Sequence, residues 1–394
     1  MAWKESDLMS LRQEFVVMAQ HPGITVAEVC RRYNISRKTG YKWLERDGAG
    51  DHLADRSRRP HTSPNRTSVR LERAVLQVRR QHPAWGGRKI NAVLARRGLV
   101  EVPAPSTITQ ILRRHGLLDE RAAAATHRPM KRFEHERPND LWQMDFKGHF
   151  ALNTGGRCHP LTVLDDHSRF SMCLRACTNE RGSTVQGALT LVFKTYGLPL
   201  RILCDNGSPW SGGSGEHHTP LTVWLMQLGV GVTHGRPYHP QTQGKEERFH
   251  GTLKRELLAE HSMRDPIDAQ KRFDAWRHVY NHERPHEALG LGVPADRYEL
   301  SPRVMPEQIE PFEYGPDDRV RTVDVNGRVS FLGQRVRVPK AFRGRRVAMR
   351  PTALDGVYEL RFREHRIGEL DTRGTHSSVR VSGRSAPSDA DRRV

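Results

Sequence analysis

The pattern that most constrains this chain is the alternation of short strand-like and longer helix-like runs between about residues 138 and 300. The strand-like runs are rich in β-branched and aromatic residues and are bounded by turn residues. Strands and helices that alternate in this way pack as layers on a shared sheet, so the pattern predicts a mixed α/β fold. Strand-like runs come first, at 141–150, 161–170 and 169–177, and they are followed by a helix at 183–197, a strand at 200–207, a helix at 219–229, a strand at 230–234 and a long helix from about Gln243.

Residues 1–50 differ from this core because they carry only helical periodicity. Thr25 and Ser36 each precede a short amphipathic run, and both residue types favour helix N-caps. Two short helices joined by a tight turn predict a helix-turn-helix DNA-binding domain, and a plain three-helix structural domain is the alternative. The candidate DNA contacts on the second of these helices are Arg37, Lys38, Tyr41, Lys42 and Arg46.

A second helical module is predicted at 67–120. Gly98 and Gly116 are expected to end helices, because glycine adopts the backbone conformation that stops a helix, and Ser106 is expected to cap one. The last helix of the module ends in basic residues. This favours a second DNA-binding module, with a connector domain as the alternative.

Short alternating segments between residues 319 and 372 predict a small, very basic β-domain. Asn326 and Gly327 lie between two apolar-alternating runs, which predicts a β-hairpin at this point. Because the segments are short and numerous, we expect a small β-barrel or a curled sheet. Residues 373–394 lack a core-forming pattern and are expected to be disordered.

Lysine and arginine outnumber aspartate and glutamate by 64 to 45, which gives a formal net charge of +19. This excess predicts a polyanionic partner, because lysine and arginine release condensed counterions when they bind phosphates; a basic but inert surface is the alternative. The sequence has no stretch of 18 apolar residues and no secretory leader pattern, and its cysteines lack zinc-binding spacing. We therefore expect a cytoplasmic, nucleoid-associated protein.

Three acidic residues lie where an α/β sheet would place an active site. Asp145 interrupts an apolar strand, where a buried carboxylate should be paired or bound to a metal. Asp205 follows a strand and begins a glycine turn, at the sheet edge where ligands bind, and Glu247 lies near the start of a long helix. Carboxylate oxygens select Mg²⁺ or Mn²⁺ over zinc. Asp205 and Glu247 taken singly have a structural alternative, as a turn former and as a residue that complements the helix dipole.

Five separated segments resemble a known family. WQMDF, CDNGS and YHPQTQGKEERFHGTLKREL are similar to the three acidic motifs of DDE transposases and retroviral-type integrases, and LDDHSRF and YNHERPHEALG resemble segments of bacterial insertion-sequence transposases of that superfamily. The resemblance covers about residues 138–300, and its specificity comes from five motifs in the same order. It implies a ribonuclease-H-like core with a mixed sheet, flanked by helix-turn-helix modules and the C-terminal β-domain.

By this resemblance, Asp145, Asp205 and Glu247 are the catalytic and metal-binding residues. Glu247 is preferred over the adjacent Glu246 because apolar residues follow it at the family's two positions, whereas Glu246 projects with the core-facing stripe of its helix. The resemblance also implies two bound Mg²⁺ ions, with Mn²⁺ as a substitute. The implied reaction hydrolyses the 3′ ends of an insertion sequence and joins them to target DNA by transesterification.

Further residues near the third acid are expected to contact DNA. His239 and Gln241 belong to the loop before the long helix, and His250 and Lys254 share a helix face with Glu247. The alternatives are a loop that only leads into the helix and solvated residues on the helix surface.

Two adjacent acids, Asp165 and Asp166, are expected to form the turn between the second and third strands, with Asp166 and Ser168 bonding the local backbone. Metal ligation is the alternative for this pair. The chain also departs from retroviral integrases in two ways: it has a longer gap between the second and third acids, at 211–220, and it lacks their N-terminal zinc module.

The predicted partners are double-stranded DNA, as both element ends and target, and further copies of the chain. Because both ends must be held at once, we expect a dimer or larger assembly on DNA. Two other functions stay open at this point. One is a DNA-binding regulator with an inactive core, and the other is a nuclease that cleaves DNA without joining it.

The sequence suggests a multidomain chain. The expected parts are a helix-turn-helix domain (1–50), a basic linker in which Arg58 and Arg59 follow a DNA backbone (51–66), a second helical module (67–120), a linker (121–137), the catalytic core (138–300), a linker (301–318), the β-barrel domain (319–372) and the tail (373–394).

Overall fold

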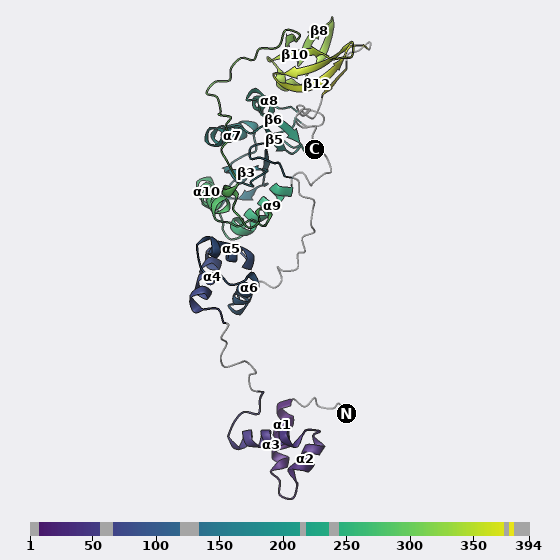
Figure 1. Cartoon of the computed structure of the whole chain (residues 1–394). Coiled ribbons are helices and arrows are strands. Elements are labelled where there is room, and N and C mark those ends of the chain that lie inside the picture. The colour runs from purple at the N-terminus through teal and green to yellow at the C-terminus, as the bar shows by residue number, and fades with distance from the viewer. Residues whose placement is uncertain are drawn as a thin grey trace. The chain divides into compact units, whose positions relative to one another are not determined.

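The computed structural model describes residues 8–55, 66–118, 134–212, 218–235, 244–373 and 378–381. It divides into two compact units, Met1–Arg66 and Thr67–Val394. The first unit is helical, and the second holds a further helical module, the α/β core and the C-terminal strands (Figure 1). None of the described helices combines the length and apolarity needed to cross a membrane.

The first unit is built from α1 (Leu8–Ala19), α2 (Val26–Arg32) and α3 (Arg37–Gly48). Both predicted caps are confirmed: the side chain of Thr25 accepts a hydrogen bond from the Glu28 amide, and that of Ser36 accepts one from the Thr39 amide. A Cβ at Gly40 would lie 2.4 Å from the Cys30 sulfur, so glycine is required for α3 to approach α2 this closely. The helices form the predicted helix-turn-helix arrangement.

The second helical module contains α4 (Val69–Gln81), α5 (Gly87–Arg96) and α6 (Pro105–Arg114). Gly98 and Gly116 follow the ends of α5 and α6 with φ of +76° and +65°, as expected for residues that stop a helix. The predicted cap at Ser106 is wrong. Helix α6 already begins at Pro105, because proline is favoured in a first helical turn, and Ala104 is its N-cap.

The core contains a mixed sheet in the order β2-β3-β1-β5-β6, with β4 paired to β3. Strand β1 is antiparallel to β3 and parallel to β5, and β5 is parallel to β6. The strands are β1 (Leu141–Phe146), β2 (Phe150–Ala151), β3 (Arg157–Asp165), β4 (Ser171–Cys177), β5 (Arg201–Cys204) and β6 (Gly231–His234). The helical elements are α7 (Gly182–Tyr196), α8 (Pro220–Gln227), α9 (Gly244–Leu253), the π-helix η3 (Lys254–Leu258), α10 (Pro266–His282) and the short 3₁₀ turns η4 (Glu287–Leu289) and η5 (Pro294–Asp296).

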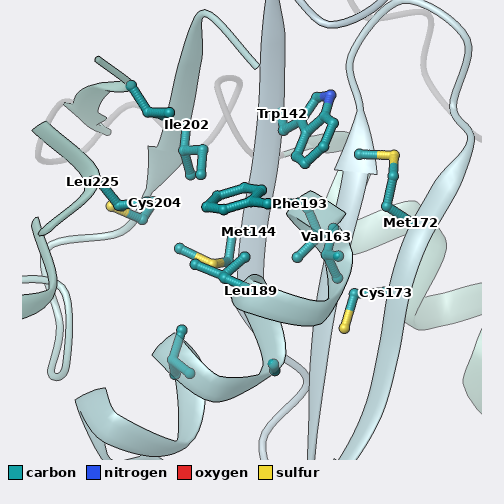
Figure 2. Packing of buried hydrophobic residues seen from close by; sticks show 14 of the residues in the cluster. Trp142, Met144, Val163, Met172, Cys173, Leu189, Phe193, Ile202, Cys204 and Leu225 are labelled. Carbon is teal, nitrogen blue, oxygen red and sulfur yellow. The ribbon is translucent and has the colours of Figure 1, made fainter. Parts of the chain in front are cut away.

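Buried side chains cover both faces of this sheet. On one face Trp142 and Met144 of β1 pack with residues of α7 and α8, among them Phe193 and Leu225 (Figure 2). On the other face the residues of α9 and α10, including Phe249, pack against β3 and β4. Because strand side chains alternate between faces, the even-numbered residues of β1 point toward α7 and α8. Its odd-numbered residues therefore point toward α9.

The C-terminal strands form an open five-stranded sheet, in the order β13-β12-β11-β10-β7, and a separate pair, β8-β9. Within the described residues these strands do not close into a ring, so the predicted small barrel is not confirmed, although a C-terminal sheet domain is present. Val223 and Met226 of α8 belong to its apolar cluster. The elements are β7 (Arg319–Thr322), β8 (Arg328–Phe331), β9 (Gln334–Arg337), the 3₁₀ turn η6 (Lys340–Phe342), β10 (Arg346–Pro351), β11 (Val357–Phe362), β12 (His365–Asp371) and β13 (Ser378–Val381).

The hairpin predicted at Asn326 and Gly327 is wrong. The chain does turn there, and the Gly327 amide donates to the Asp324 carbonyl. The strands that flank this turn, β7 and β8, belong to different sheets: β7 pairs with β10, and β8 pairs with β9. The turn that joins β8 to β9 is at Leu332 and Gly333, where both φ angles are positive, as a two-residue type I′ turn requires.

Candidate active site

The ends of two parallel strands bring Asp145 and Asp205 together. In the β1–β5 pairing, Gln143 lies opposite Leu203. Continuing this register by two residues places Asp145, near the end of β1, level with Asp205, directly after β5. The odd-numbered position of Asp145 turns its side chain toward α9. The two acids therefore lie at the same edge of the sheet.

The charge of Asp205 and the burial of the strand end both act on Asp145. Partial burial raises the pKa of Asp145 to about 7, and the negative charge of Asp205 adds to the rise. Both effects disfavour the ionised form. Asp205 is half-buried, and its Oδ1 accepts a hydrogen bond of 2.9 Å from the Gly207 amide, so it also forms the local turn. The two carboxyl groups repel each other at this sheet edge, and a bound cation would reduce the repulsion.

The first turn of α9 separates the two adjacent glutamates. The side chain of Glu246 is only 2% exposed, whereas Glu247 is exposed. The prediction that Glu246 projects into the core with the apolar stripe of α9 is confirmed by its burial together with Phe249 and Leu253. Glu247 lies three residues before His250, whose Nδ1 is 3.9 Å from Asp145 Oδ2. Residues three apart are neighbours on a helix, which favours Glu247 on the side of α9 near Asp145, but no contact of the described residues joins Glu247 to Asp145 or Asp205.

Thr162, directly opposite Asp145 on β3, ties this region together. Its hydroxyl lies 2.9 Å from the Asp145 carbonyl oxygen, 3.0 Å from Glu246 Oε2 and 2.9 Å from His250 Nε2. A hydroxyl has one proton to donate, and a carbonyl can only accept. All three contacts are hydrogen bonds only if Thr162 donates to the carbonyl and both Glu246 and His250 donate to Thr162. The contacts are thus satisfied by a protonated Glu246 and a neutral His250.

The electrostatics of Glu246 and His250 agree with these proton positions. Complete burial, reinforced by the charge of Asp145, raises the pKa of Glu246 well above its usual range. Burial lowers the pKa of His250 to about 3. Oε1 of Glu246 has no hydrogen-bond partner among the described residues. Burial thus favours the neutral form of Glu246, which lies on the buried side of α9, whereas Glu247 faces solvent.

The predicted DNA contacts divide into three groups. Lys254, at the start of η3, is exposed, and so are four of the predicted contacts in the first unit, Arg37, Lys38, Tyr41 and Lys42. Those that lie outside the described residues are Arg58, Arg59, His239 and Gln241. His250 and Arg46 are buried, and these two need correction.

The prediction that His250 holds the DNA backbone is not supported, because His250 is 9% exposed, neutral and bonded to Thr162. Arg46 is 8% exposed, its guanidinium donates to the Ala54 carbonyl at 3.1 Å, and it lies over the ring of Trp43 at 5.1 Å. Both side chains are engaged inside their own domain. Helix-face periodicity alone did not show how deeply each would be packed.

The turn between β3 and β4 is made by Asp165 rather than Asp166. Asp165 Oδ2 accepts hydrogen bonds from the amide and the hydroxyl of Ser168, and Oδ1 accepts one from the Asn139 amide. Asp166 instead bonds residues distant in the sequence: the His135 amide, the Gln143 side chain and Lys245. The turn prediction is thus confirmed for Asp165, and the local backbone bonds expected of Asp166 are absent from its described contacts.

Sequence reasoning missed Thr162, the link between His250 and Asp145, and the partners of Asp166. One signal was available, since Glu246 and His250 are four residues apart on a helix and hence neighbours. Thr162 and Asp166 could not be found this way. Thr162 contacts Glu246 and His250, and Asp166 contacts Lys245, and each of these partners lies at least 79 residues further along the chain. Their other partners, the Asp145 carbonyl, Gln143 and the His135 amide, lie earlier in the chain. Among the described residues, no three His, Cys, Asp or Glu side chains are already grouped closely enough to hold one ion.

Family comparisons match each part of the chain. Two integrase core domain matches cover residues 135–240 and 228–294, which together carry all the acids discussed above. The C-terminal domain of IS481 family transposases matches residues 318–378. A helix-turn-helix domain matches residues 11–61, and a homeodomain-like domain matches 39–112.

Curated relatives are proteins of bacterial insertion elements. The transposase InsD of insertion element IS2 from Escherichia coli is 27% identical over 297 residues, which cover 71% of this chain and 92% of InsD. An uncharacterized 31.7 kDa protein of insertion element IS407 from Burkholderia multivorans is 25% identical, covering 59% of this chain and 82% of that protein. A protein of IS476 from Xanthomonas euvesicatoria is 30% identical, over 40% of this chain and 44% of its own length.

Two similar solved structures come from retroviral systems. The catalytic core domain of HTLV-2 integrase, in complex with magnesium, gives a TM-score of 0.32 at 17% identity, over 41% of this chain and 97% of that one. A simian T-cell lymphotropic virus intasome with a PP2A regulatory subunit gives 0.36 at 15% identity, over 78% and 96%. Likenesses at these TM-scores are too distant to transfer any detail of the site.

The ordered acidic motifs, the sheet edge that joins Asp145 to Asp205, the integrase core matches and the insertion-element relatives agree with one another. The helix-turn-helix matches add the DNA-binding modules expected of an enzyme that moves DNA. Together these findings support a bacterial insertion-sequence transposase of the superfamily of DDE transposases and retroviral-type integrases.

Proposed function

We propose that this transposase binds the ends of its insertion sequence, hydrolyses their 3′ ends and joins them to target DNA by transesterification. The observation that carries the proposal is the placement of Asp145 and Asp205 at the ends of adjacent parallel strands, where burial and the charge of Asp205 raise the pKa of Asp145. A pair of repelling carboxyl groups at a sheet edge is typical of a site that binds divalent cations.

The residues at this edge fit a divalent metal. Carboxylate oxygens are the ligands that Mg²⁺ prefers, and Mn²⁺ accepts the same ligands. We propose that Asp145, Asp205 and Glu247 hold two Mg²⁺ ions, with Mn²⁺ as a substitute. Ions bound there would activate the attacking water or 3′-hydroxyl and stabilise the leaving oxygen of the phosphodiester. Glu247 is preferred to Glu246 as the third ligand because its side chain is exposed, whereas Glu246 is buried and its pKa is raised well above the usual range.

The protein's own side chains position these ligands and the substrate. Neutral His250 lies against Asp145 without adding a positive charge that would compete with a metal. Thr162 fixes the Asp145 backbone and the first turns of α9 at the same time. Exposed Lys254, two helical turns beyond Glu247, is proposed to hold the phosphate backbone near the cut.

DNA recognition is assigned to the helical modules at 1–50 and 67–120. The exposed residues Arg37, Lys38, Tyr41 and Lys42 are proposed to contact DNA through α3, and the linker residues Arg58 and Arg59 to follow its backbone. His239 and Gln241 are proposed to contact DNA near the cut phosphate. Because two element ends must react together, we propose a dimer or larger assembly on DNA, in the cytoplasm and associated with the nucleoid.

A cleavage and joining assay tests this function. The full chain is incubated with end-labelled duplexes that carry the inverted repeats flanking its coding region, with Mg²⁺ or Mn²⁺. We expect metal-dependent nicking at the 3′ ends, and joining of a pre-cut 3′-hydroxyl end to a second duplex. Asp145→Asn should bind the same DNA without cutting it.

Two outcomes would overturn the proposal in different ways. A DNA-binding regulator would bind the repeats but show no nicking in either wild type or Asp145→Asn. A nuclease would nick but give no joined product from the pre-cut end.

A further inference from the structure

One buried carboxylate lies between the strand and the helix that carry the proposed metal ligands. The side chain of Asp166, directly after β3, is fully buried. Its Oδ1 accepts a 2.7 Å hydrogen bond from Gln143 and forms an ion pair with Lys245, and its Oδ2 accepts a 2.9 Å bond from the His135 amide. Lys245 Nζ also lies 3.4 Å from the Asp166 carbonyl oxygen.

The two side chains bonded to Oδ1 of Asp166 each lie two residues before a proposed metal ligand. Gln143 lies two residues before Asp145 on β1, and Lys245 lies two residues before Glu247 on α9. Residues two apart on a strand share a face, so Gln143 and Asp145 both point toward α9. A single carboxylate oxygen thus links the strand of the first acid to the first turn of the helix of the third.

The burial of this contact makes it selective. A buried carboxylate requires a paired charge and filled hydrogen-bond positions, so Asp166 favours only those placements of α9 that keep Lys245 within reach. The side chain of Lys245 is itself only 17% exposed. Its burial lowers its pKa, and the nearby charge of Asp166 opposes that effect. A lysine held in this way is poorly placed to serve as a surface contact for DNA.

We propose that Asp166 and Lys245 are positioning residues that set the placement of α9 against β1, and thereby hold Glu247 where it completes a metal site with Asp145 and Asp205. This inference rests on the proposed function, because it concerns the same metal site. Neither residue touches a metal or the substrate. Their effect passes through the backbone of the first turn of α9 and through Gln143.

The test measures Mn²⁺ affinity, from the resonance signal of free Mn²⁺, on the full chain without DNA and well below the melting temperature of each variant. The variants are Lys245→Met, Asp166→Asn and the double variant. Asp165→Asn is the matched control, because Asp165 is a buried acid of the same turn whose described bonds do not reach α9. Lys271→Met, an exposed lysine of α10, controls for the loss of a positive charge.

We expect each single variant to weaken Mn²⁺ binding by about ten- to a hundred-fold, the size of effect seen when groups that orient metal ligands are removed. The double variant should be no weaker than the worse single variant, because both changes break the same contact. Both controls should bind Mn²⁺ with nearly the wild-type affinity. A purely structural pair would lower the melting temperature and leave the metal affinity of the folded protein unchanged.

Failure of this inference differs from failure of the proposed function. If Asp145→Asn and Glu247→Gln lose Mn²⁺ binding but Lys245→Met and Asp166→Asn keep it, the positioning role is wrong and the metal site stands. If Lys245→Met instead weakens DNA binding with unchanged Mn²⁺ affinity, Lys245 is a DNA contact and the inference is overturned. If all four variants bind Mn²⁺ as the wild type does, the metal site itself is wrong. Should Asp166→Asn fail to fold, Lys245→Met alone decides the outcome.

Discussion

Two pairs of acids at the same sheet differ in their hydrogen-bond partners. Asp145 and Asp205 lie at adjacent strand ends, and burial, together with the charge of Asp205, raises the pKa of Asp145 to about 7. The turn acids, Asp165 and Asp166, are more deeply buried, and burial raises the pKa of Asp165 as well, but their oxygens receive amide, hydroxyl, side-chain amide and ammonium donors. Burial alone therefore does not mark the functional pair.

This comparison distinguishes acids whose hydrogen bonds stabilise the folded state from acids whose burial and like-charged neighbour destabilise it. A buried carboxylate with a full set of donors contributes to the structure, whereas one facing a like charge destabilises it and is retained for function. The strand-end acids would be stabilised by a ligand that carries positive charge. Four predictions test this distinction, beginning with the largest expected effect.

The largest effect is expected when the same comparison is made between the two adjacent glutamates of α9, Glu246 and Glu247. Glu247→Gln should reduce the nicking rate by roughly a thousand-fold or more, because it removes a metal ligand worth several kcal/mol in the transition state. Glu246→Gln should retain most activity, since burial favours the neutral form of Glu246, which an amide resembles. Nicking rates under single-turnover conditions measure both. Equal losses in the two variants would contradict the assignment of the third ligand.

The next effect is a pH dependence of stability in the metal-free protein. The folded pKa of Asp145 is raised from 3.8 to about 7, so the folded state binds its proton more tightly than the unfolded state. Its contribution to stability is complete below about pH 4 and is lost as the pH rises to about 7, at roughly 1.4 kcal/mol for each pKa unit as an upper limit. Urea unfolding at several pH values should therefore show that the free energy of unfolding of Asp145→Asn rises relative to that of wild type as the pH increases from about 4 to about 7. A constant difference would argue against the raised pKa of Asp145.

A smaller effect contrasts the two pairs directly at neutral pH without metal. Asp145→Asn should stabilise the fold, because it removes a carboxylate held near another. Asp165→Asn should destabilise it by about 1–3 kcal/mol, because donors that now bond the carboxylate would face an amide. Thermal unfolding of both variants gives the signs. Finding the same sign for both would erase the distinction between the pairs.

The smallest effect is stabilisation by the metal itself. With Mg²⁺ at ten times its dissociation constant, wild type should gain about 1.4 kcal/mol of unfolding free energy. Asp145→Asn should gain much less, and Asp165→Asn should gain as much as wild type. Melting temperatures with and without Mg²⁺, at fixed ionic strength, measure the gain. A gain in Asp145→Asn as large as in wild type would place the metal elsewhere.

Sequence reasoning worked best where a signal was local. The strand around Asp145 and the strand end at Asp205 were predicted from apolar runs and from the glycine turn that follows, and the structure has both. It failed at Asn326, where a favourable hairpin dipeptide did not pair its flanking strands. Turn chemistry fixes the local backbone, but the partner of each strand depends on the packing of the whole sheet.

The amino-acid sequence by itself determined the order of the elements, the acids at the strand ends and the inward direction of Glu246, because each follows from the spacing of neighbouring residues. Only the tertiary structure decided that Thr162 lies between Asp145 and Glu246, that Lys245 reaches Asp166, and that Arg46 and His250 are engaged in their own domains. These contacts join residues from separate elements. Their geometry is set by how the sheet and helices pack, which short-range patterns do not encode.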